Sequence, residues 1–406
     1  MRNHRHSNGI DAGPETLRAP RGEFLTFGLP LIEEDEVAEV LATLRSGWLG
    51  TGPRTRTFEQ RFADFIGVPH AVALNSCTAG LHLALDVLGI GPGDEVIVPA
   101  LTFAATANVV CHVGATPIFA DVEFATGNLA PAEVEAAISP RTRAIIPVHF
   151  AGRPCDMNAL MAIAKRHSLH VVEDAAHATE SWYHGQKIGA IGDMAAFSFY
   201  STKNLVTGEG GMVTTHDGAW ADALRIRGLH GISRDAWKRY SAAGYQPYEV
   251  LYPGFKYNMT DMQAALGLPQ LAKLERNWLR RERLWQLYQQ ALARHDELVL
   301  PAPDEPGTKH ARHLYTILID LNRLTVDRYG FIDAMRQHNI GTGVHFEPLH
   351  LQPYYRERFG YRVGQFPHAE EIGRRTVSLP LSPKMTEDDA WDVVSAVRRV
   401  LAQVAR

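Results

Sequence analysis

The first 260 residues alternate between short apolar runs and amphipathic segments of helical period. The apolar runs have the length of strands and cover residues 70–74, 95–99, 117–121, 143–150 and 170–176. Amphipathic segments lie between them, and one that precedes the first run ends at Gly67. Short strands alternating with helices of about 10–15 residues are typical of βαβ units with right-handed crossovers. The pattern therefore predicts a large α/β domain over residues 24–260, with a mainly parallel central sheet.

From Thr260 onward the pattern changes to helical periodicity that is sustained over many turns. It extends to His295 and is interrupted only by Pro269, which predicts a long connector helix. Beyond a loop at 301–307, the segments HLYTILIDL (313–321) and GTGVHF (341–346) predict strands, and the segments 326–339 and 387–405 predict helices. We therefore expect residues 261–406 to form the connector helix and a smaller α+β domain.

The N-terminal residues 1–23 are polar and rich in Arg, His, Gly and Pro, without the apolar stretch of a signal peptide, so we expect a flexible extension. The net charge of −4 gives no electrostatic reason to expect binding to nucleic acid or to an anionic membrane. No apolar run reaches the roughly 18–20 residues that span a bilayer. Three widely spaced cysteines without a Cys-x-x-Cys pair favour a reducing compartment, so we expect a cytoplasmic protein.

Two segments place polar or aromatic residues just after predicted strands, where ligands bind in open parallel sheets. NSCTAGL (75–81) leads into a helix whose first-turn N–H groups can bind a phosphate, with Ser76 and Thr78 as hydroxyl donors. An ordinary helix cap is the alternative for this pair. Phe103 follows the strand at 95–99 and could stack on a planar ring, or could pack in the core.

Two further strand ends carry ionisable groups. Asp174 could bind a cationic ring nitrogen and keep it protonated, because a nearby opposite charge favours the charged form. A helix cap for Asp174 and a hydrogen-bonded loop position for His177 are the alternatives. In FSFYSTKNLVTGEGG (197–211), burial or neighbouring cations would prepare the Lys203 amine for attack on an aldehyde, with the Ser198 hydroxyl close by. A solvated surface lysine is the alternative.

The phosphate-binding turn, stacking aromatic, strand-end aspartate and lysine, in that order, resemble a fold-type-I pyridoxal-phosphate enzyme. More narrowly, the chain resembles the DegT/StrS-type nucleotide-sugar aminotransferases from about Phe27 to Val400. The motifs that carry this resemblance are GWLGTGP (47–53), PALTFAATAN (99–108), EDAAHA (173–178), FSFYSTKN (197–204), GEGG (208–211), PGFKYNMTDMQAALG (253–267) and VHFEPLHLQPYY (344–355).

The resemblance implies a role for each matching position. Lys203 would bind pyridoxal 5'-phosphate (PLP) covalently and then transfer protons as acid and base. Asp174 would pair with the pyridine nitrogen, Phe103 would stack on the ring, and His177 would lie near its phenolic oxygen. The residues that would bind the phosphate are Cys77, Thr78 and Ser198.

Asn258 matches a residue that, in this family, reaches the phosphate from the partner subunit. The resemblance therefore implies a homodimer with shared active sites. Cys77 departs from the family, which more often has glycine there, but backbone donation to a phosphate survives that change. The residues that we expect to contact substrate are Trp48, Tyr257, Tyr315 and His345.

The resemblance also implies two half-reactions. L-Glutamate would leave its amino group on the cofactor as pyridoxamine 5'-phosphate, and that amine would then be transferred to a keto group of a nucleotide-linked sugar. EVLYPGFKYNMTD (249–261) and VHFEPLHLQPYYRERFGY (344–361) look most similar to the aminoarabinose and bacillosamine branch, which acts at C4 of a UDP-linked keto-sugar.

Other interpretations stay open. Aminotransferases that act on keto-cyclitols or antibiotic precursors would share the cofactor half of the site. A sugar dehydratase of the same superfamily would replace Lys203 by histidine, and a non-catalytic sensor would keep the fold without turnover. His345 and His350 flank a glutamate, but their spacing fits no compact metal-binding pattern, so we expect no metal there.

Overall fold

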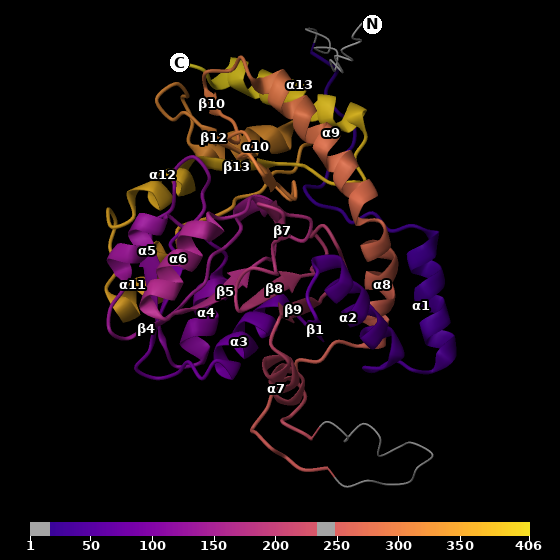
Figure 1. Ribbon diagram of the computed structural model, residues 1–406. Helices are drawn as coiled ribbons and strands as arrows, with labels where there is room; N and C mark the ends of the chain where they lie inside the picture. Colours follow the sequence, from indigo (N-terminus) through magenta and orange to yellow (C-terminus); the bar gives the residue numbers. More distant parts are fainter. Residues whose placement is uncertain (1–16, 234–247) are drawn as a thin grey trace, which may run out of the picture.

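The structure, a computed structural model, describes residues 17–233 and 248–406 and has a seven-stranded sheet at its centre (Figure 1). The strands of this sheet are β1 (His70–Leu74), β2 (Glu95–Pro99), β3 (Thr116–Ala120), β4 (Thr142–Ile145), β5 (His170–Asp174), β8 (Met194–Ser198) and β9 (Gly211–Thr215). Their spatial order is β1-β9-β8-β5-β4-β2-β3. β9 is antiparallel to both of its neighbours, and the other adjacent pairs are parallel. The prediction of a mainly parallel α/β sheet is thus confirmed.

Helices cover both faces of the sheet. They are α2 (Pro53–Ile66), α3 (Cys77–Val87), α4 (Ala104–His112), α5 (Pro131–Ala137), α6 (Met157–His167), α7 (Gly218–Gly228) and α8 (Asp261–Ala272). Successive strand residues point to opposite faces, and in this sheet both sets are apolar. Val171 belongs to a core with α2, α5, α6 and α8, whereas Val172 belongs to a core with α3, α4 and α7. This burial leaves the strand ends as the place for polar groups.

The C-terminal part of the chain, residues 274–406, has a separate apolar core. Its antiparallel sheet consists of β10 (Leu298–Val299), β12 (Tyr315–Ile319) and β13 (Thr376–Leu379). Its helices are α9 (Leu274–Leu292), α10 (Arg328–Gln337), α11 (Pro353–Phe359), α12 (Pro367–Arg375) and α13 (Glu387–Val404). Helices α9 and α13 pack side by side over this sheet (Figure 1). A further small sheet joins β11 (Thr308–Lys309) to β6 (Trp182–Tyr183) and β7 (Gln186–Lys187).

The prediction of a single connector helix was wrong, because the segment forms the two helices α8 and α9. The break lies at Lys273, whose backbone is non-helical at φ −103° and ψ 1°. Pro269 lies inside α8, where it removes one backbone donor, and the helix ends within a turn of it. The Lys273 ammonium also pairs with acidic side chains at the start of α1 (Glu34–Ser46), including Asp35 at 2.6 Å. The division of the chain at residue 260 stays a prediction.

Two strand predictions also need correction. GTGVHF (341–346) is not a strand, and only Gly343 pairs, in an isolated bridge with Ser378. The third strand of the C-terminal sheet is β13, whose Val377 is fully buried. β4 is shorter than predicted and ends before Pro147, which has no N–H for a sheet hydrogen bond.

The N-terminal extension is described only from residue 17, so residues 1–16 of the expected flexible segment lie outside the described part. Residues 17–23 lie against α13. Arg21 pairs with Asp389 at 2.6 Å and with Asp392 at 2.9 Å. Within the ranges 17–233 and 248–406, no helix combines the length and the apolar composition needed to cross a membrane.

Candidate active site

The turn between β1 and α3 presents backbone donors at the end of the central sheet. Ser76 is the N-cap of α3: its hydroxyl accepts from the Ala79 N–H at 3.1 Å, and its carbonyl accepts from the Gly80 N–H at 3.2 Å. The N–H groups of Cys77 and Thr78 have no acceptor among the described residues. Ser76 is therefore a cap, the alternative that the sequence left open, and the next two residues supply the free donors of this helix end.

The sheet register brings a second polar group to the same edge. Leu74, Gly211 and Ser198 are aligned across the neighbouring strands β1, β9 and β8. Ser198 is the last residue of β8, and its side chain is almost fully buried. Ser198 therefore lies at the same edge of the sheet as the start of α3, two strands away from Leu74 and separated from it by Gly211.

Gly211 makes this close approach possible. A Cβ atom at this position would lie 2.4 Å from the carbonyl carbon of Ser76 and 2.5 Å from the nitrogen of Cys77. These atoms are backbone, so the helix start itself would have to move.

We expect Gly211→Ala to weaken PLP binding by at least about tenfold and to lower the thermal midpoint, because overpacking of this kind costs about 1–3 kcal/mol. Titration of the apoprotein with PLP and thermal unfolding would measure both effects. Gly22→Ala is the matched control, since a Cβ there meets nothing within 4 Å and neither Gly22 nor Gly211 has a left-handed backbone conformation. Equal loss of PLP affinity in the two variants would contradict the explanation.

Asp174 is the last residue of β5 and is held by two hydrogen bonds. Its Oδ2 accepts from the Thr106 hydroxyl at 2.8 Å, and its Oδ1 accepts from the Ala176 N–H at 3.2 Å. Burial raises the pKa of the carboxyl group, although both hydrogen bonds and the Lys203 charge act in the opposite direction. Desolvation is the largest effect, so the carboxylate lacks full compensation and would gain from a bound cation.

Lys203 lies in the loop between β8 and β9, close enough to Asp174 and Cys77 to interact with them electrostatically. Burial lowers the pKa of its amine to about 8, although both neighbours raise it. At pH 7 roughly one amine in ten is therefore neutral, compared with fewer than about one in a thousand for an ordinary lysine. A neutral amine is the nucleophilic form, so the geometry fits attack on an aldehyde.

A cluster of histidine rings faces the same amine. The His177 ring centroid lies 4.3 Å from that of His313 and 6.5 Å from that of His345. Burial is the main cause that lowers the pKa of each ring, and the Lys203 charge lowers each further, that of His345 to about 3. All three rings are therefore neutral at pH 7. Nδ1 of His177 is buried and has no hydrogen-bond partner among the described residues.

Phe103 is not a core residue. It precedes α4 as its N-cap and is 61% exposed, which is unusual for a phenylalanine in a well-packed domain. Its ring centroid lies 6.2 Å from that of Phe346, which in turn lies 6.1 Å from the His177 ring. An open aromatic face therefore borders the histidine cluster, as stacking on a planar ring requires.

Trp48 and Asn258 lie together at a second location beside the turn. The Trp48 indole donates to the Thr51 carbonyl at 3.1 Å, and the Asn258 amide donates to the Thr51 hydroxyl at 2.7 Å. The backbone of Asn258 forms a bridge with Leu74, the last residue of β1. Within one chain, Asn258 is thus held beside the start of α3.

Of the other two expected substrate contacts, Tyr315 lies away from these residues, whereas Tyr257 lies beside the turn, where its carbonyl accepts from the Asn75 N–H at 2.7 Å. Tyr315 is fully buried in the C-terminal core, where its ring lies 4.8 Å from Trp285, so no substrate reaches it in this structure. It belongs to β12, and the alternation of that strand turns it inward. Tyr257 directs its hydroxyl to His82 at 3.2 Å and stacks on Phe255 at 5.0 Å. Tyr315 therefore has a packing role in this structure, whereas Tyr257 stays a predicted substrate contact.

Sequence reasoning did not find His313, Phe346 or Asp261. The Asp261 carboxylate accepts from the Gly52 N–H at 2.8 Å and from the Thr55 N–H at 2.9 Å, so it caps α2 from a distant helix. That contact joins the GWLGTGP and PGFKYNMTDMQAALG motifs. His313 is the first residue of the mostly apolar segment HLYTILIDL. This polar residue at the start of a predicted strand was a local signal that could have identified it.

These residues fit the cofactor that the resemblance implies. The turn at Cys77 and Thr78 offers phosphate donors, Asp174 forms no ion pair among the described residues, and Phe103 offers an open ring face. Nδ1 of His177 is a buried polar atom without a partner among the described residues, and it lies in the ring cluster near Lys203, where a ligand oxygen would satisfy it. The Lys203 amine would meet an aldehyde.

Comparison with known proteins gives the family of the chain. A sequence model of the DegT/DnrJ/EryC1/StrS aminotransferase family matches residues 30–398. The chain is 52% identical over 382 residues to the spore coat polysaccharide biosynthesis protein SpsC of Bacillus subtilis (strain 168). The aligned region covers 94% of this chain and 98% of SpsC.

Solved structures of the same fold give a similar result. The putative sugar aminotransferase Spr1654 from Streptococcus pneumoniae, in its PMP form, matches with a TM-score of 0.88 at 34% identity, over 93% of this chain and 99% of Spr1654. Its PLP form matches with a TM-score of 0.87. Helicobacter pylori PseC, an aminotransferase involved in the biosynthesis of pseudoaminic acid, matches with a TM-score of 0.87 at 27% identity, over 94% of this chain and 100% of PseC. The chain therefore belongs to the DegT/DnrJ/EryC1/StrS aminotransferase family, with the type-I fold and the PLP cofactor of that family.

Proposed function

We propose that the protein is a sugar aminotransferase that moves the amino group of L-glutamate to a keto group, at C4, of a nucleotide-linked sugar. The observation that carries the proposal is the Lys203 amine, with a pKa of about 8, in the loop after β8 and close to the buried Asp174 carboxylate at the end of the neighbouring strand β5. Sugar pathways are named for SpsC and PseC, and these relatives support a sugar as the acceptor. The motifs at 249–261 and 344–361 support the C4 position.

PLP, when bound, supplies an aldehyde that takes up the amino group and a ring that delocalises negative charge. Lys203 would hold that aldehyde through Nζ and, when free of it, would act as acid and base through the same atom. As a neutral amine it takes a proton from Cα of the amino donor, and as an ammonium it returns the proton later in the transfer. A pKa near 8 suits both directions, because neither form of the amine is strongly favoured at pH 7–8.

The other residues bind and orient. Asp174 keeps the ring nitrogen protonated, since its buried carboxylate is stabilised by a cation. Cys77, Thr78 and Ser198 bind the phosphate, and Phe103 covers one face of the ring.

The substrate half of the site has fewer assigned residues. His345 is the strongest candidate for a sugar contact, because its ring is neutral and joins the cluster around Lys203, while its Nδ1 is paired with the Ser378 hydroxyl at 2.7 Å. Trp48 is half exposed at the GWLGTGP loop and remains a candidate.

The quaternary arrangement and location are part of the same proposal. In a homodimer with shared sites, Asn258 would reach the phosphate of the partner subunit. We also infer a cytoplasmic location, where nucleotide-linked sugars and L-glutamate are both present.

The proposal predicts a complete transfer that can be followed in two stages. Mixing the PLP-loaded protein with L-glutamate should convert the cofactor to its amine form, seen as loss of the visible absorbance band, within the turnover time of a typical enzyme, about 0.1 s. A panel of nucleotide-linked 3-keto and 4-keto sugars should then restore the band, fastest with a 4-keto sugar. Restoration by a keto-cyclitol alone would favour the cyclitol alternative, and no loss of the band with any amino donor would contradict aminotransfer.

A further inference from the structure

Asn204 directly follows Lys203 and is buried with every polar side-chain atom in use. Its Nδ2 donates to Oε2 of Glu180 at 2.8 Å and to the carbonyl of Ala311 at 2.9 Å. Its Oδ1 lies 3.0 Å from Nδ1 of His313. One side chain therefore joins the Lys203 loop to the loop after β5 and to the segment before β12.

These contacts determine the protonation of His313. Both hydrogens of the Asn204 amide point to acceptors, so its Oδ1 can only accept, and Nδ1 of His313 has to donate. Burial is the main cause that lowers the pKa of this ring well below its usual value, so the ring is neutral. The neutral ring with a proton on Nδ1 leaves Nε2 as an acceptor, next to His177 and within electrostatic reach of Lys203.

Glu180 connects the same network to helix α9. Its other oxygen pairs with Arg281, and the side chains of Glu180 and Arg281 are only 2% and 1% exposed. Two further nitrogens of Arg281, Nε and Nη1, have no partner among the described residues. A charge buried this deeply is tolerated only with its counter-charge in place, so the Glu180 carboxylate is fixed between Arg281 and Asn204.

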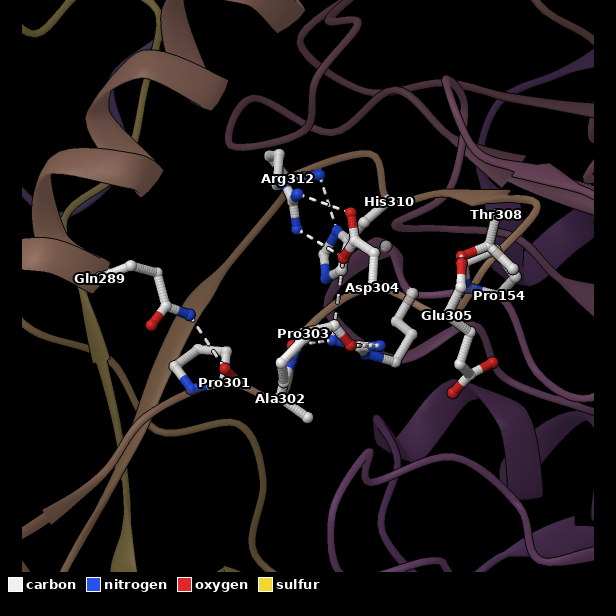
Figure 2. A network of polar contacts seen from close by, with 12 residues as sticks. Pro154, Gln289, Pro301, Ala302, Pro303, Asp304, Glu305, Thr308, His310 and Arg312 are labelled. Carbon is white, nitrogen blue, oxygen red and sulfur yellow. Dashed lines mark hydrogen bonds and ion pairs between the residues drawn. The ribbon is translucent and has the colours of Figure 1, made fainter. Parts of the chain in front are cut away.

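The segment that carries Ala311 and His313 has a separate anchor. The guanidinium of Arg312 donates two hydrogen bonds to the carboxylate of Asp304, at 2.9 Å and 2.6 Å (Figure 2). The backbone N–H of Arg312 donates to Nδ1 of His310 at 2.8 Å. Arg312 also has a φ of +51°, a conformation that is strained for any residue but glycine. The partners of Asn204 are therefore held independently of Asn204 itself.

We propose that Asn204 is a positioning residue, which fixes the Lys203 amine relative to the cofactor aldehyde by joining the lysine loop to α9 through Glu180 and Arg281 and by setting the tautomer of His313. The inference rests on the proposed role of Lys203. It makes α9, a helix of the C-terminal part, a structural support of the reacting lysine. A displacement of about 1 Å at a reacting group can cost up to about 10²-fold in rate, so loss of this support should be measurable.

Asn128 provides a matched control. It is also buried, donates through Nδ2 to the carbonyls of Arg153 and Pro154 at 3.2 Å and 2.8 Å, and accepts from the Phe150 N–H at 2.9 Å. Asn128→Ala and Asn204→Ala therefore each remove three hydrogen bonds, although one bond of Asn204 goes to the Glu180 carboxylate and is stronger. Asn204→Ala should lose somewhat more thermal stability than Asn128→Ala, and only Asn204 neighbours the lysine.

The test measures attachment of PLP to Lys203 in the apoprotein, without any sugar or amino donor. Samples are reduced with borohydride at intervals, and the labelled peptide is quantified by mass spectrometry over pH 6–10. We expect Asn204→Ala to slow attachment by at least about tenfold and to move its midpoint to higher pH, because water entering the loop would raise the pKa of the amine toward 10.4. Asn128→Ala should stay within about twofold of the natural protein. Equal rates in the two variants would overturn the proposal.

A second variant tests the same role in a protein that is expected to stay folded even if Asn204→Ala does not. Glu180→Leu combined with Arg281→Met replaces the buried ion pair by apolar groups, a change that is often neutral or stabilising. This double variant should keep its thermal midpoint and yet attach PLP at the slow rate of Asn204→Ala; attachment at the natural rate would contradict the positioning role. If the natural protein itself attaches no PLP at Lys203, the proposed function fails as well, so the two failures are distinguishable.

Discussion

Replacing Lys203 by alanine should reduce aminotransfer by about 10²–10⁴-fold or more, because the residue is the proposed proton carrier and the covalent anchor of PLP. The variant should still bind PLP through the phosphate donors, but without the absorbance band of the lysine-bound cofactor. Turnover with L-glutamate and a keto-sugar, together with absorbance spectra, would measure both effects. Retention of both the band and turnover would show that another group performs the chemistry.

Lys187 is the matched control for this experiment. Burial lowers the pKa of its amine to about 8 as well, so it shares the electrostatic property on which the assignment of Lys203 depends. Its amine, however, lies over the rings of Phe65 at 3.0 Å and Trp182 at 5.2 Å, away from the strand ends. Lys187→Ala should therefore keep turnover within about twofold, apart from a modest loss of stability. A comparable loss of turnover in Lys187→Ala would show that a lowered pKa does not by itself identify Lys203 as the reacting lysine.

Asp174→Asn is the second substitution with a large expected effect. The amide keeps the size of the carboxylate and can still accept from the Thr106 hydroxyl, but it carries no charge for the ring nitrogen. We expect kcat to fall by about 10²–10³-fold, in the range of other losses of a positioned charge or donor in an active site, while PLP binding weakens less. Steady-state kinetics and PLP titration would separate the two effects.

Asp121 gives the corresponding control at the end of another strand of the same sheet. It is buried just after β3, and its carboxylate accepts from the N–H groups of His368 and Ala369 at 2.9 Å and 2.8 Å, so it caps α12. Asp121→Asn should cost about 0.5–2 kcal/mol of stability and leave kcat unchanged. If both Asp→Asn variants lowered kcat equally, general destabilisation would explain the result and the role of Asp174 would be rejected.

The sequence predicted the central sheet well because each strand and helix carries its own local pattern. The apolar run at 170–174 is buried on both faces, and the helix before β1 ends at Gly67, whose φ is +87°. Asp174 and Lys203 were identifiable for the same reason, since Asp174 ends one strand and Lys203 lies in the loop that follows another. Residues at strand ends are the part of an α/β site that local patterns can reveal.

What the sequence did not reveal depends on contacts between distant segments. Asn204 meets Ala311 across 107 positions and Asp261 caps α2 across more than 200, and no periodicity connects such pairs. Tyr315 shows the opposite error: an aromatic residue near the site in sequence is turned into the C-terminal core by strand alternation. The break at Lys273 depends on acidic partners from the start of α1, which no local pattern includes.

The alignment of Leu74, Gly211 and Ser198 has a consequence for how this protein can change over time. Backbone hydrogen bonds set that alignment, and they are indifferent to the apolar side chain at each strand position. Interior positions of the sheet can therefore be substituted among Val, Ile, Leu and Ala while the strand ends beside the start of α3 keep their arrangement. Gly211 is the exception, because a single added carbon would press on the helix start. Mutational tolerance should thus be broad along the strands and narrow at one glycine.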